Sequence, residues 1–153
     1  MENCEVESMK KNILFVASEA VPFIKTGGLA DVAGSLPKYF DKEQYDVRVM
    51  LPKYLCIPEK WRSQMKYVTH FYMDLAWRSQ YVGVLEMEYA GVHYYFIDNE
   101  FYFAGPKPYG YIHEDIEKFA FFSKAALSAM PLLNFKPDIV HCHDWQTGLV
   151  PVY

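Results

Sequence analysis

Cysteine is scarce in this sequence. Only three of its 153 residues are cysteines, Cys4, Cys56 and Cys142, and no two of them form a Cys-x-x-Cys pair. An odd number at these spacings does not indicate the disulfide framework of a small secreted domain. The chain also lacks the basic and then apolar start of a secretory signal, because residues 1–7 include three glutamates. We therefore expect a protein of the reducing cytoplasm.

Long apolar runs and an excess of positive charge are absent as well. No apolar run approaches the ~20 residues that a membrane-spanning helix requires. Lysine and arginine number 15 against 19 acidic residues, which gives a formal net charge of −4, and the basic residues are scattered among the acids. Nucleic-acid binding requires a basic patch or stripe, which this sequence lacks. Neither a membrane nor a nucleic acid is expected as a partner.

Two common nucleotide-binding fingerprints are missing. The sequence contains no Gly-x-Gly-x-x-Gly, and no lysine follows a glycine-rich loop as it does in a P-loop. It also contains no internal repeat or low-complexity segment, which excludes a solenoid. With 153 residues, of which 52% are hydrophobic and 22% charged, the chain has the length and composition of one globular domain.

What the sequence does contain is a glycine pair between a predicted strand and a predicted helix. Residues 12–18 are almost continuously apolar, which is typical of a strand buried on both faces of a parallel sheet. Gly27 and Gly28 then allow a tight turn, and the free amides of the following helix can hold an anion, with Lys25 as a nearby cation. We predict that these three residues bind phosphate groups, with a solvent-exposed turn as the alternative.

Strands and helices alternate along the first half of the chain. Apolar residues recur at helical spacing over 29–40, although Gly34 and Pro37 weaken this helix near its end. Alternating apolar residues over 46–51 predict a second strand. A strand, loop, helix and strand in this order form a right-handed crossover unit. We predict an α/β fold with a doubly wound, mostly parallel sheet and helices on both of its faces.

The middle of the chain predicts an antiparallel hairpin and a long helix. Residues 81–89 and 92–97 have a period of two and are separated by an Ala-Gly pair, which indicates a hairpin. Residues 105–110 contain two glycines and two prolines, which predicts a loop. The apolar face over 116–130 then predicts a helix with acidic residues in its first turn.

Polar residues follow the predicted strand over 139–141. His143 and Asp144 stand at its carboxyl end, where ligands bind in open parallel sheets. Asp144 can hydrogen-bond sugar hydroxyls or oppose positive charge at an anomeric carbon, and the alternative is a carboxylate that caps the next helix. His141 and His143 with Asp144 also suggest a metal site, but without a recognisable further ligand we favour hydrogen-bonded structural histidines. Residues 148–153 resemble the start of a further helix.

Two stretches carry a resemblance to a known family. Residues 17–32 combine Ala-Ser-Glu-Ala-Val-Pro with KTGGLADV and resemble the amino-terminal signature of bacterial glycogen synthases and plant starch synthases. Residues 136–151, KPDIVHCHDWQTGLVP, are similar to that family's Pro-Asp-(apolar)-(apolar)-His-x-His-Asp-Trp segment. The resemblance covers residues 11–153. It implies the amino-terminal lobe of a two-lobed, GT-B-type glucosyltransferase that transfers glucose from ADP-glucose to the non-reducing end of an α-1,4-glucan, with retention of configuration.

The same resemblance implies roles for individual residues. Lys25 corresponds to a lysine that contacts the nucleotide-sugar phosphates, and Asp31 to an acid that faces the donor pocket. Asp31 has an alternative, because a carboxylate in the first turn of a helix is favourable without any ligand. Asp144 corresponds to a donor-site residue important for turnover, and His143 is expected to line the cleft. We assign Asp144 and His143 as catalytic and predict Lys25, Gly27, Gly28 and Asp31 as substrate-binding residues.

A predicted loop on the acceptor side adds one more substrate-binding residue. The loop through Tyr109 and Tyr111 resembles an acceptor-side loop of the synthases, where an aromatic ring can stack on a glucose face. Packing of the rings within the loop is the alternative. We include Tyr109 among the predicted substrate-binding residues.

The resemblance also predicts the domain organisation. Residues 1–10 carry none of it and are expected to be a disordered extension, whereas residues 11–153 are expected to be a catalytic lobe, incomplete at its carboxyl end. Expected partners are a nucleotide sugar, an α-glucan and the second, nucleotide-binding lobe, without which these residues alone are expected to be inactive. No cofactor or metal is expected beyond the ADP-glucose donor. A metal-dependent hydrolase using His141, His143 and Asp144, and a non-catalytic carbohydrate-binding module, are the alternatives.

Overall fold

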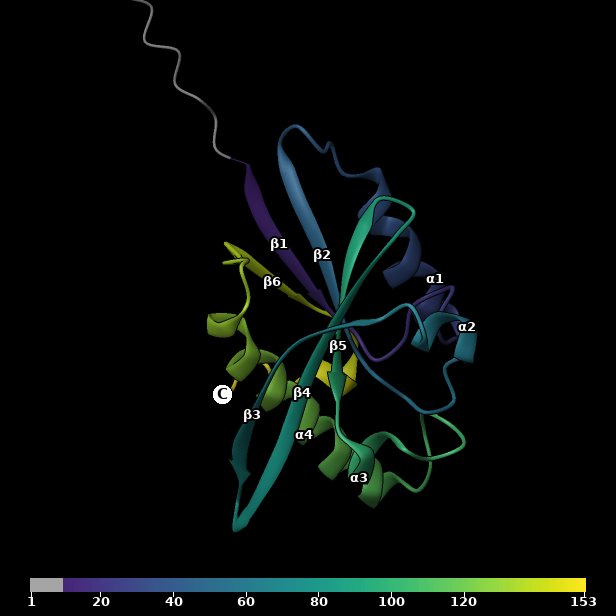
Figure 1. Ribbon diagram of the computed structural model, residues 1–153, viewed down its shortest axis with the longest axis vertical. Coiled ribbons are helices and arrows are strands. Elements are labelled where there is room, and N and C mark those ends of the chain that lie inside the picture. Colours follow the sequence, from purple (N-terminus) through teal and green to yellow (C-terminus); the bar gives the residue numbers. More distant parts are fainter. Residues whose placement is uncertain (1–9) are drawn as a thin grey trace, which may run out of the picture.

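A computed structural model of the protein, which describes residues 10–153, is built on a six-stranded mixed sheet (Figure 1). The strand order is β3-β4-β5-β2-β1-β6. β6, β1, β2 and β5 are parallel to one another, whereas β4 is antiparallel to both β5 and β3. The predicted mostly parallel sheet and the predicted hairpin are confirmed. The strands are β1 (Lys11–Val16), β2 (Tyr45–Pro52), β3 (Lys66–Leu75), β4 (Arg78–Tyr89), β5 (Val92–Asp98) and β6 (Ile139–Cys142).

The chain reverses its direction across the sheet at β1. It passes from β1 to β2 on one side, and it later reaches β6 on the other side of β1. Val16 pairs with Met50 of β2 and with Cys142 of β6, so the carboxyl ends of these strands are aligned. A reversal of this kind leaves a crevice beyond the carboxyl ends, where ligands of open α/β sheets bind.

Helices cover both faces of the sheet, as the sequence predicts. They are α1 (Gly28–Ser35), α2 (Glu59–Arg62), α3 (Glu100–Phe103) and α4 (Ile112–Ala129), with 3-10 turns η1 (Leu36–Tyr39), η2 (Met130–Leu132) and η3 (Trp145–Thr147). Phe40, which follows α1 and η1, packs edge-on against Phe15 with ring centroids 6.0 Å apart. On the opposite face Ser128 of α4 donates a hydrogen bond to the sulfur of Met73 in β3. Figure 1 shows α1 and α2 on one side of the sheet, with the tip of the β3–β4 hairpin extending away from them.

The core is dominated by β1 and by aromatic side chains. Leu14, Phe15 and Val16 are fully buried, as expected for a continuous apolar strand with helices on both faces. Phe23 packs edge-on against Tyr94 and Phe96 of β5, at centroid distances of 4.8 and 5.2 Å. Such edge-to-face pairs stabilise a core beyond the area that they bury.

The structure refines several predicted boundaries. α1 ends at Ser35 and continues as the 3-10 turn η1 around Pro37, because proline donates no amide to the helix. Residues 148–152 form turns rather than the predicted start of a helix. The predicted extension over 1–10 lies outside the described residues, apart from Lys10. Within residues 10–153 none of the helices has the length and apolarity needed to cross a membrane.

Candidate functional site

The loop between β1 and α1 turns tightly at the carboxyl end of β1. Ala20 accepts backbone hydrogen bonds from Phe23 and Ile24, and the Val21–Pro22 peptide bond is cis. This turn lies directly against α1. A Cβ at Gly34 would stand only 2.4 Å from the carbonyl oxygen of Val21, so glycine is required for the contact. The loop is therefore fixed in place by the helix that it precedes.

A buried carboxylate fastens the second half of this loop. Glu19 is 3% exposed, and it accepts hydrogen bonds from the backbone amide of Thr26 and from Thr26 Oγ1, the latter at 2.9 Å to Oε2. A buried carboxylate is tolerated only when donors satisfy it, and charge-assisted bonds of this kind are strong. Glu19 therefore positions the residues on either side of Thr26, Lys25 and Gly27. Sequence reasoning missed it, although an acid within the otherwise mostly apolar run over 17–21 is a signal.

Lys25 and Asp31, both predicted as substrate-binding, form an ion pair with each other. Lys25 Nζ lies 2.7 Å from Asp31 Oδ2, and the two side chains are 53% and 54% exposed. An ion pair this exposed contributes less than about 1 kcal/mol to stability, because water screens the charges. Lys25 is therefore readily shared with, or transferred to, an incoming anion.

The glycine pair leaves the amino end of α1 open. Gly27 is the N-cap residue of α1, and no side chain within residues 10–153 caps this end of the helix. A Cβ added at Gly27 or Gly28 would meet no atom of the described chain within 4 Å. The space beside both glycines is thus open, and the positive end of the helix dipole favours an anion at this end of α1.

The two histidines after β6 are stacked on each other. The rings of His141 and His143 have centroids 4.3 Å apart, and Phe15 packs against both. His143 is 8% exposed, and its Nε2 has no hydrogen-bond partner among residues 10–153. Burial, followed by the neighbouring charge of His141, lowers the pKa of His143 to about 4. His143 is therefore neutral at pH 7, and its Nε2 is buried without a hydrogen-bond partner among residues 10–153.

A metal site around these histidines finds no support in the described part of the chain. Residues 10–153 contain no group of three or more His, Cys, Asp or Glu side chains that could hold a metal ion together. The stacked arrangement of His141 and His143 also places their rings face to face rather than converging on one point. Divalent metals in proteins need three or four converging ligands.

Asp144 combines a capping role with an unusual backbone. Its carboxylate accepts a hydrogen bond of 2.7 Å from the amide of Trp145, so it caps η3, which is the alternative role for this acid. The side chain is nevertheless exposed. Its φ of 62° and ψ of −178° lie in a region that only glycine adopts without strain. Strained backbone of this kind clusters at ligand-binding and active sites.

Tyr109 connects the loop over 105–111 with the ends of the central strands. Its hydroxyl lies 2.7 Å from Ser18 Oγ and accepts a hydrogen bond of 3.3 Å from Gln146 Nε2. Burial raises the pKa of Tyr109 to about 12, and the carboxylates of Glu19 and Asp144 contribute to the rise. Its ring is half-buried, with its centroid 5.7 Å from that of Phe119. Gln146, which sequence reasoning did not single out, is buried and helps to position this hydroxyl.

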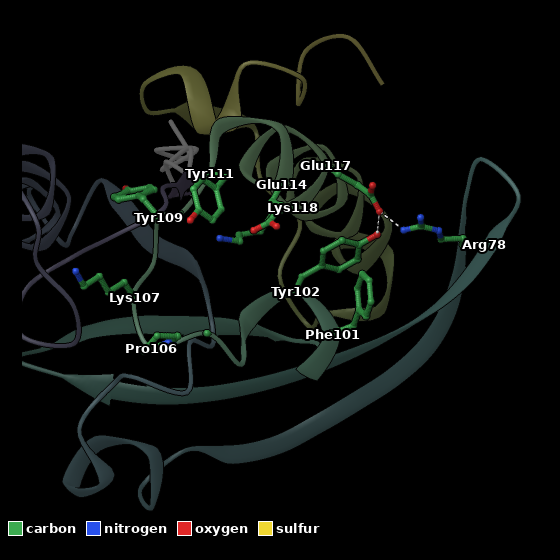
Figure 2. A pocket seen from close by; sticks show the side chains of 12 residues that line it. Arg78, Phe101, Tyr102, Pro106, Lys107, Tyr109, Tyr111, Glu114, Glu117 and Lys118 are labelled. Carbon is green, nitrogen blue, oxygen red and sulfur yellow. Dashed lines mark hydrogen bonds and ion pairs between the residues drawn. The ribbon is translucent and has the colours of Figure 1, made fainter.

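A cavity of about 660 Å³ opens beside Tyr109 (Figure 2). Figure 2 shows Tyr109 and Lys107 toward one side of it and Arg78 toward the other, with Tyr111, Glu114 and Lys118 between them. Lys118 fastens the loop to α4, because its Nζ binds Asp115 at 2.7 Å and the carbonyl oxygen of Pro108 at 2.9 Å. The lining residues are Arg78, Phe101, Tyr102, Gly105, Pro106, Lys107, Tyr109, Gly110, Tyr111, Glu114, Glu117 and Lys118.

The predicted site residues therefore fall into two groups that share one anchor. Lys25, Gly27, Gly28 and Asp31 lie together around the amino end of α1, whereas Tyr109, His143 and Asp144 lie at the carboxyl ends of β1 and β6. Adjacent residues at the end of β1 hold both groups: Ser18 bonds to Tyr109, and Glu19 bonds to Thr26. The amino end of a helix, a lysine, a carboxylate and neutral hydrogen-bonding groups thus lie at the carboxyl end of the central strands.

Comparison with known proteins gives consistent matches. The family model of the starch synthase catalytic domain matches residues 12–153. Over 143 residues the chain is 76% identical to the glycogen synthase of Lachnospira eligens and 71% identical to that of Lachnoclostridium phytofermentans, matches that cover 94% of this chain and 30% of each relative. The chain spans about 30% of the length of the curated relatives that it matches.

A solved structure agrees with these sequence matches. The fold is similar to that of the catalytic domain of starch synthase IV from Arabidopsis thaliana bound to ADP and acarbose, with a TM-score of 0.76 and 29% sequence identity. The match covers 92% of this chain and 29% of that one.

Proposed function

This chain belongs to the starch synthase catalytic-domain family, and from that premise we propose that it forms part of a retaining glucosyltransferase of glycogen or starch synthesis. The reaction is the transfer of glucose from ADP-glucose to the non-reducing end of an α-1,4-glucan. The observation that carries the proposal is the open, lysine-flanked amino end of α1, which follows the carboxyl end of β1 at the strand reversal of the sheet.

The amino end of α1 is the proposed diphosphate site. The amides around Gly27 and Gly28 donate to phosphate oxygens, and Lys25 moves from Asp31 toward the diphosphate. Because negative charge grows on the diphosphate as the glycosidic bond breaks, a cation and fixed amides stabilise the transition state more than the ground state. Asp31 then orients Lys25 until the donor arrives. The starch synthase IV neighbour is bound to ADP, which supports a nucleotide as a ligand of this family's catalytic domain.

Asp144, His143 and Tyr109 are the proposed contacts of the reacting glucose. The Asp144 carboxylate opposes the positive charge that develops at the anomeric carbon. His143, neutral because of its lowered pKa, exchanges hydrogen bonds with a sugar hydroxyl without adding a positive charge to that centre. Tyr109 stays protonated at neutral pH and presents a fixed hydroxyl to the donor or acceptor. No carboxylate is assigned as a covalent nucleophile.

The cavity beside Tyr109 is the proposed entry of the acceptor. It begins at Tyr109, one of the proposed contacts of the reacting glucose, and continues over exposed aromatic side chains, among them Tyr111, which is 72% exposed. The starch synthase IV neighbour is bound to acarbose, which supports an oligosaccharide as a ligand of this family's catalytic domain. Tyr111, rather than the half-buried Tyr109, then offers the ring face for stacking.

The remaining features of the reaction are proposed from its chemistry. Donor and acceptor must be aligned and shielded from water, so we propose that a second lobe of the whole protein closes over this edge of the sheet. The transfer requires neither a metal nor an organic cofactor besides the donor itself. ADP-glucose and glycogen are substrates of the cell interior, which agrees with a cytoplasmic location.

Glucose incorporation by the full-length protein tests the proposal. Labelled ADP-glucose and glycogen are supplied, and UDP-glucose is run in parallel to establish the donor. We expect Lys25→Ala to lower incorporation at least about a hundredfold, because a lost charged hydrogen bond to phosphate in a dry site is worth several kcal/mol. Lys66→Ala is the control, since Lys66 is an exposed lysine at the start of the edge strand β3. Undiminished incorporation by Lys25→Ala defeats the diphosphate assignment, and no incorporation by the unmodified protein defeats the proposed reaction.

A further inference from the structure

At the Arg78 end of the cavity, one exposed aromatic ring, Phe101, lines the wall, and a second, Trp77, lies beyond the lining residues; both are near the Arg78 guanidinium. Phe101 of α3 is 71% exposed, and Trp77, at the turn of the β3–β4 hairpin, is 87% exposed. The guanidinium of Arg78 lies 5.6 Å from the centroid of the Trp77 ring and 5.9 Å from that of the Phe101 ring. Two large rings exposed this fully in one place are a surface feature that folding alone does not require.

This wall is held in place by polar contacts. Glu117 of α4 forms an ion pair with Arg78 and accepts a hydrogen bond of 2.9 Å from the hydroxyl of Tyr102. Tyr102 is buried, and its ring stacks on Phe121 at a centroid distance of 4.5 Å. Figure 2 shows Tyr102, Glu117 and Arg78 meeting at this end of the cavity, next to Phe101. The guanidinium that lies beside both rings is therefore pre-positioned rather than free to rotate.

The charges of this wall favour a neutral ligand over an ionic one. Arg78 is neutralised by Glu117, and Lys118 is neutralised by Asp115 and bonded to Pro108. A phosphate or carboxylate would have to compete with these pairs. A sugar chain needs no net charge, because its C–H faces pack on aromatic rings while its hydroxyls bond to the outer edges of paired charged groups.

We propose that Trp77, Arg78 and Phe101 form a secondary carbohydrate subsite, which holds glucose units of the acceptor remote from its reacting end. The subsite is continuous with the cavity that begins at Tyr109, so one chain can occupy both. This inference rests on the proposed function for the identity of the sugar as an α-1,4-glucan. The subsite makes the protein favour long acceptors, since only a long chain extends from the reacting end to the rings of Trp77 and Phe101.

The test compares acceptors of two lengths on the full-length protein. Trp77→Ala and Phe101→Ala are each expected to raise the KM for maltoheptaose about tenfold relative to the KM for maltose, a factor equivalent to about 1.4 kcal/mol, with kcat unchanged. Tyr72→Ala is the matched control, because Tyr72 is a 69% exposed aromatic residue of β3 that, unlike Trp77 and Phe101, is not packed against Arg78 and does not line the cavity. A ratio of KM values that stays the same in both variants overturns the subsite.

A second measurement separates the subsite from the transfer reaction. Native electrophoresis through gels that contain glycogen reports binding without any donor or turnover. We expect the unmodified protein to be retarded, and Trp77→Ala and Phe101→Ala to migrate faster than Tyr72→Ala. Retardation that is equal in all of them overturns the proposal. If the protein transfers no glucose but its retardation depends on the two rings, the subsite stands and the proposed reaction fails.

Discussion

The strained backbone of Asp144 allows a sharp test of what this residue is for. Two substitutions remove its carboxylate: Asp144→Ala keeps a Cβ on a backbone with φ of 62° and ψ of −178°, whereas Asp144→Gly does not. Both variants lose the hydrogen bond to the amide of Trp145. Any difference in stability between them therefore comes from the backbone alone.

The expected magnitudes follow from three effects on the free energy of unfolding. Loss of the cap costs each variant about 1 kcal/mol. The glycine-only conformation costs a residue with a Cβ about 1–3 kcal/mol, which Asp144→Gly recovers. Glycine also gives the unfolded chain about 0.5–1 kcal/mol of extra conformational entropy, which offsets part of this gain. We expect Asp144→Ala to be destabilised by about 1 kcal/mol and Asp144→Gly to stay close to the unmodified protein.

Denaturant unfolding measures these differences, and glucose incorporation by the full-length protein measures the functional cost. Both variants are expected to lose most of their turnover, because neither has a carboxylate to oppose the charge at the anomeric carbon. Asp144→Asn, which retains the cap, should likewise fold normally and turn over slowly. If Asp144→Gly is less stable than Asp144→Ala, the backbone is not strained as the reasoning requires. Normal turnover in the glycine variant would remove Asp144 from the reaction.

Two further predictions concern buried polar groups at the same edge of the sheet. Glu19→Gln places an amide where Thr26 presents two donors. We therefore expect the free energy of unfolding to fall by about 2 kcal/mol and the KM for ADP-glucose to rise. Glu43→Gln, at an exposed position, is the control and should leave both values unchanged. An unaltered KM would show that the hydrogen bonds between Glu19 and Thr26 do not position the proposed diphosphate loop. The second prediction concerns His143, whose pKa falls from 6.5 in the unfolded chain to about 4 on folding. The unfolded chain therefore binds a proton more readily than the folded protein. The contribution of His143 to stability is complete above pH 6.5 and is lost as the pH falls toward 4. Urea unfolding at pH 7 and pH 5 should show that the free energy of unfolding falls more between these pH values in the unmodified protein than in His143→Phe. An equal fall in both proteins would contradict the assigned burial.

The elements that sequence reasoning locates are those whose pattern is local. The continuous apolar run of β1, the glycine pair before α1 and the Ala-Gly turn between β4 and β5 each lie within a few residues, and the structure confirms all three. The apolar face over 116–130 also predicts a helix, although α4 begins earlier, at Ile112, because the polar first turn carries no apolar period. Local periodicity thus determines the order of elements well enough to place Asp144 at a strand end.

The contacts that shape the site could not be predicted in this way. Ser18 and Tyr109 meet at 2.7 Å although 91 residues separate them, and Gln146 reaches the same hydroxyl from a third segment. The backbone strain at Asp144 and the cavity lined by α3, α4 and the β3–β4 hairpin likewise depend on how distant elements pack. The sequence contains these residues, but only the folded chain determines their distances.

The segment that follows β1 connects the proposed donor side with the proposed acceptor side. Ser18 and Glu19 are adjacent residues in the segment that follows β1, and their side chains bind different partners. One reaches Tyr109 and the cavity, and the other reaches Thr26 and the lysine-flanked loop. Because Val16, immediately before this segment, is fully buried and paired on both sides, this end of the strand is rigid. The proposed diphosphate loop and the proposed acceptor cavity are therefore both attached to the same short segment after β1, which fixes their relative positions.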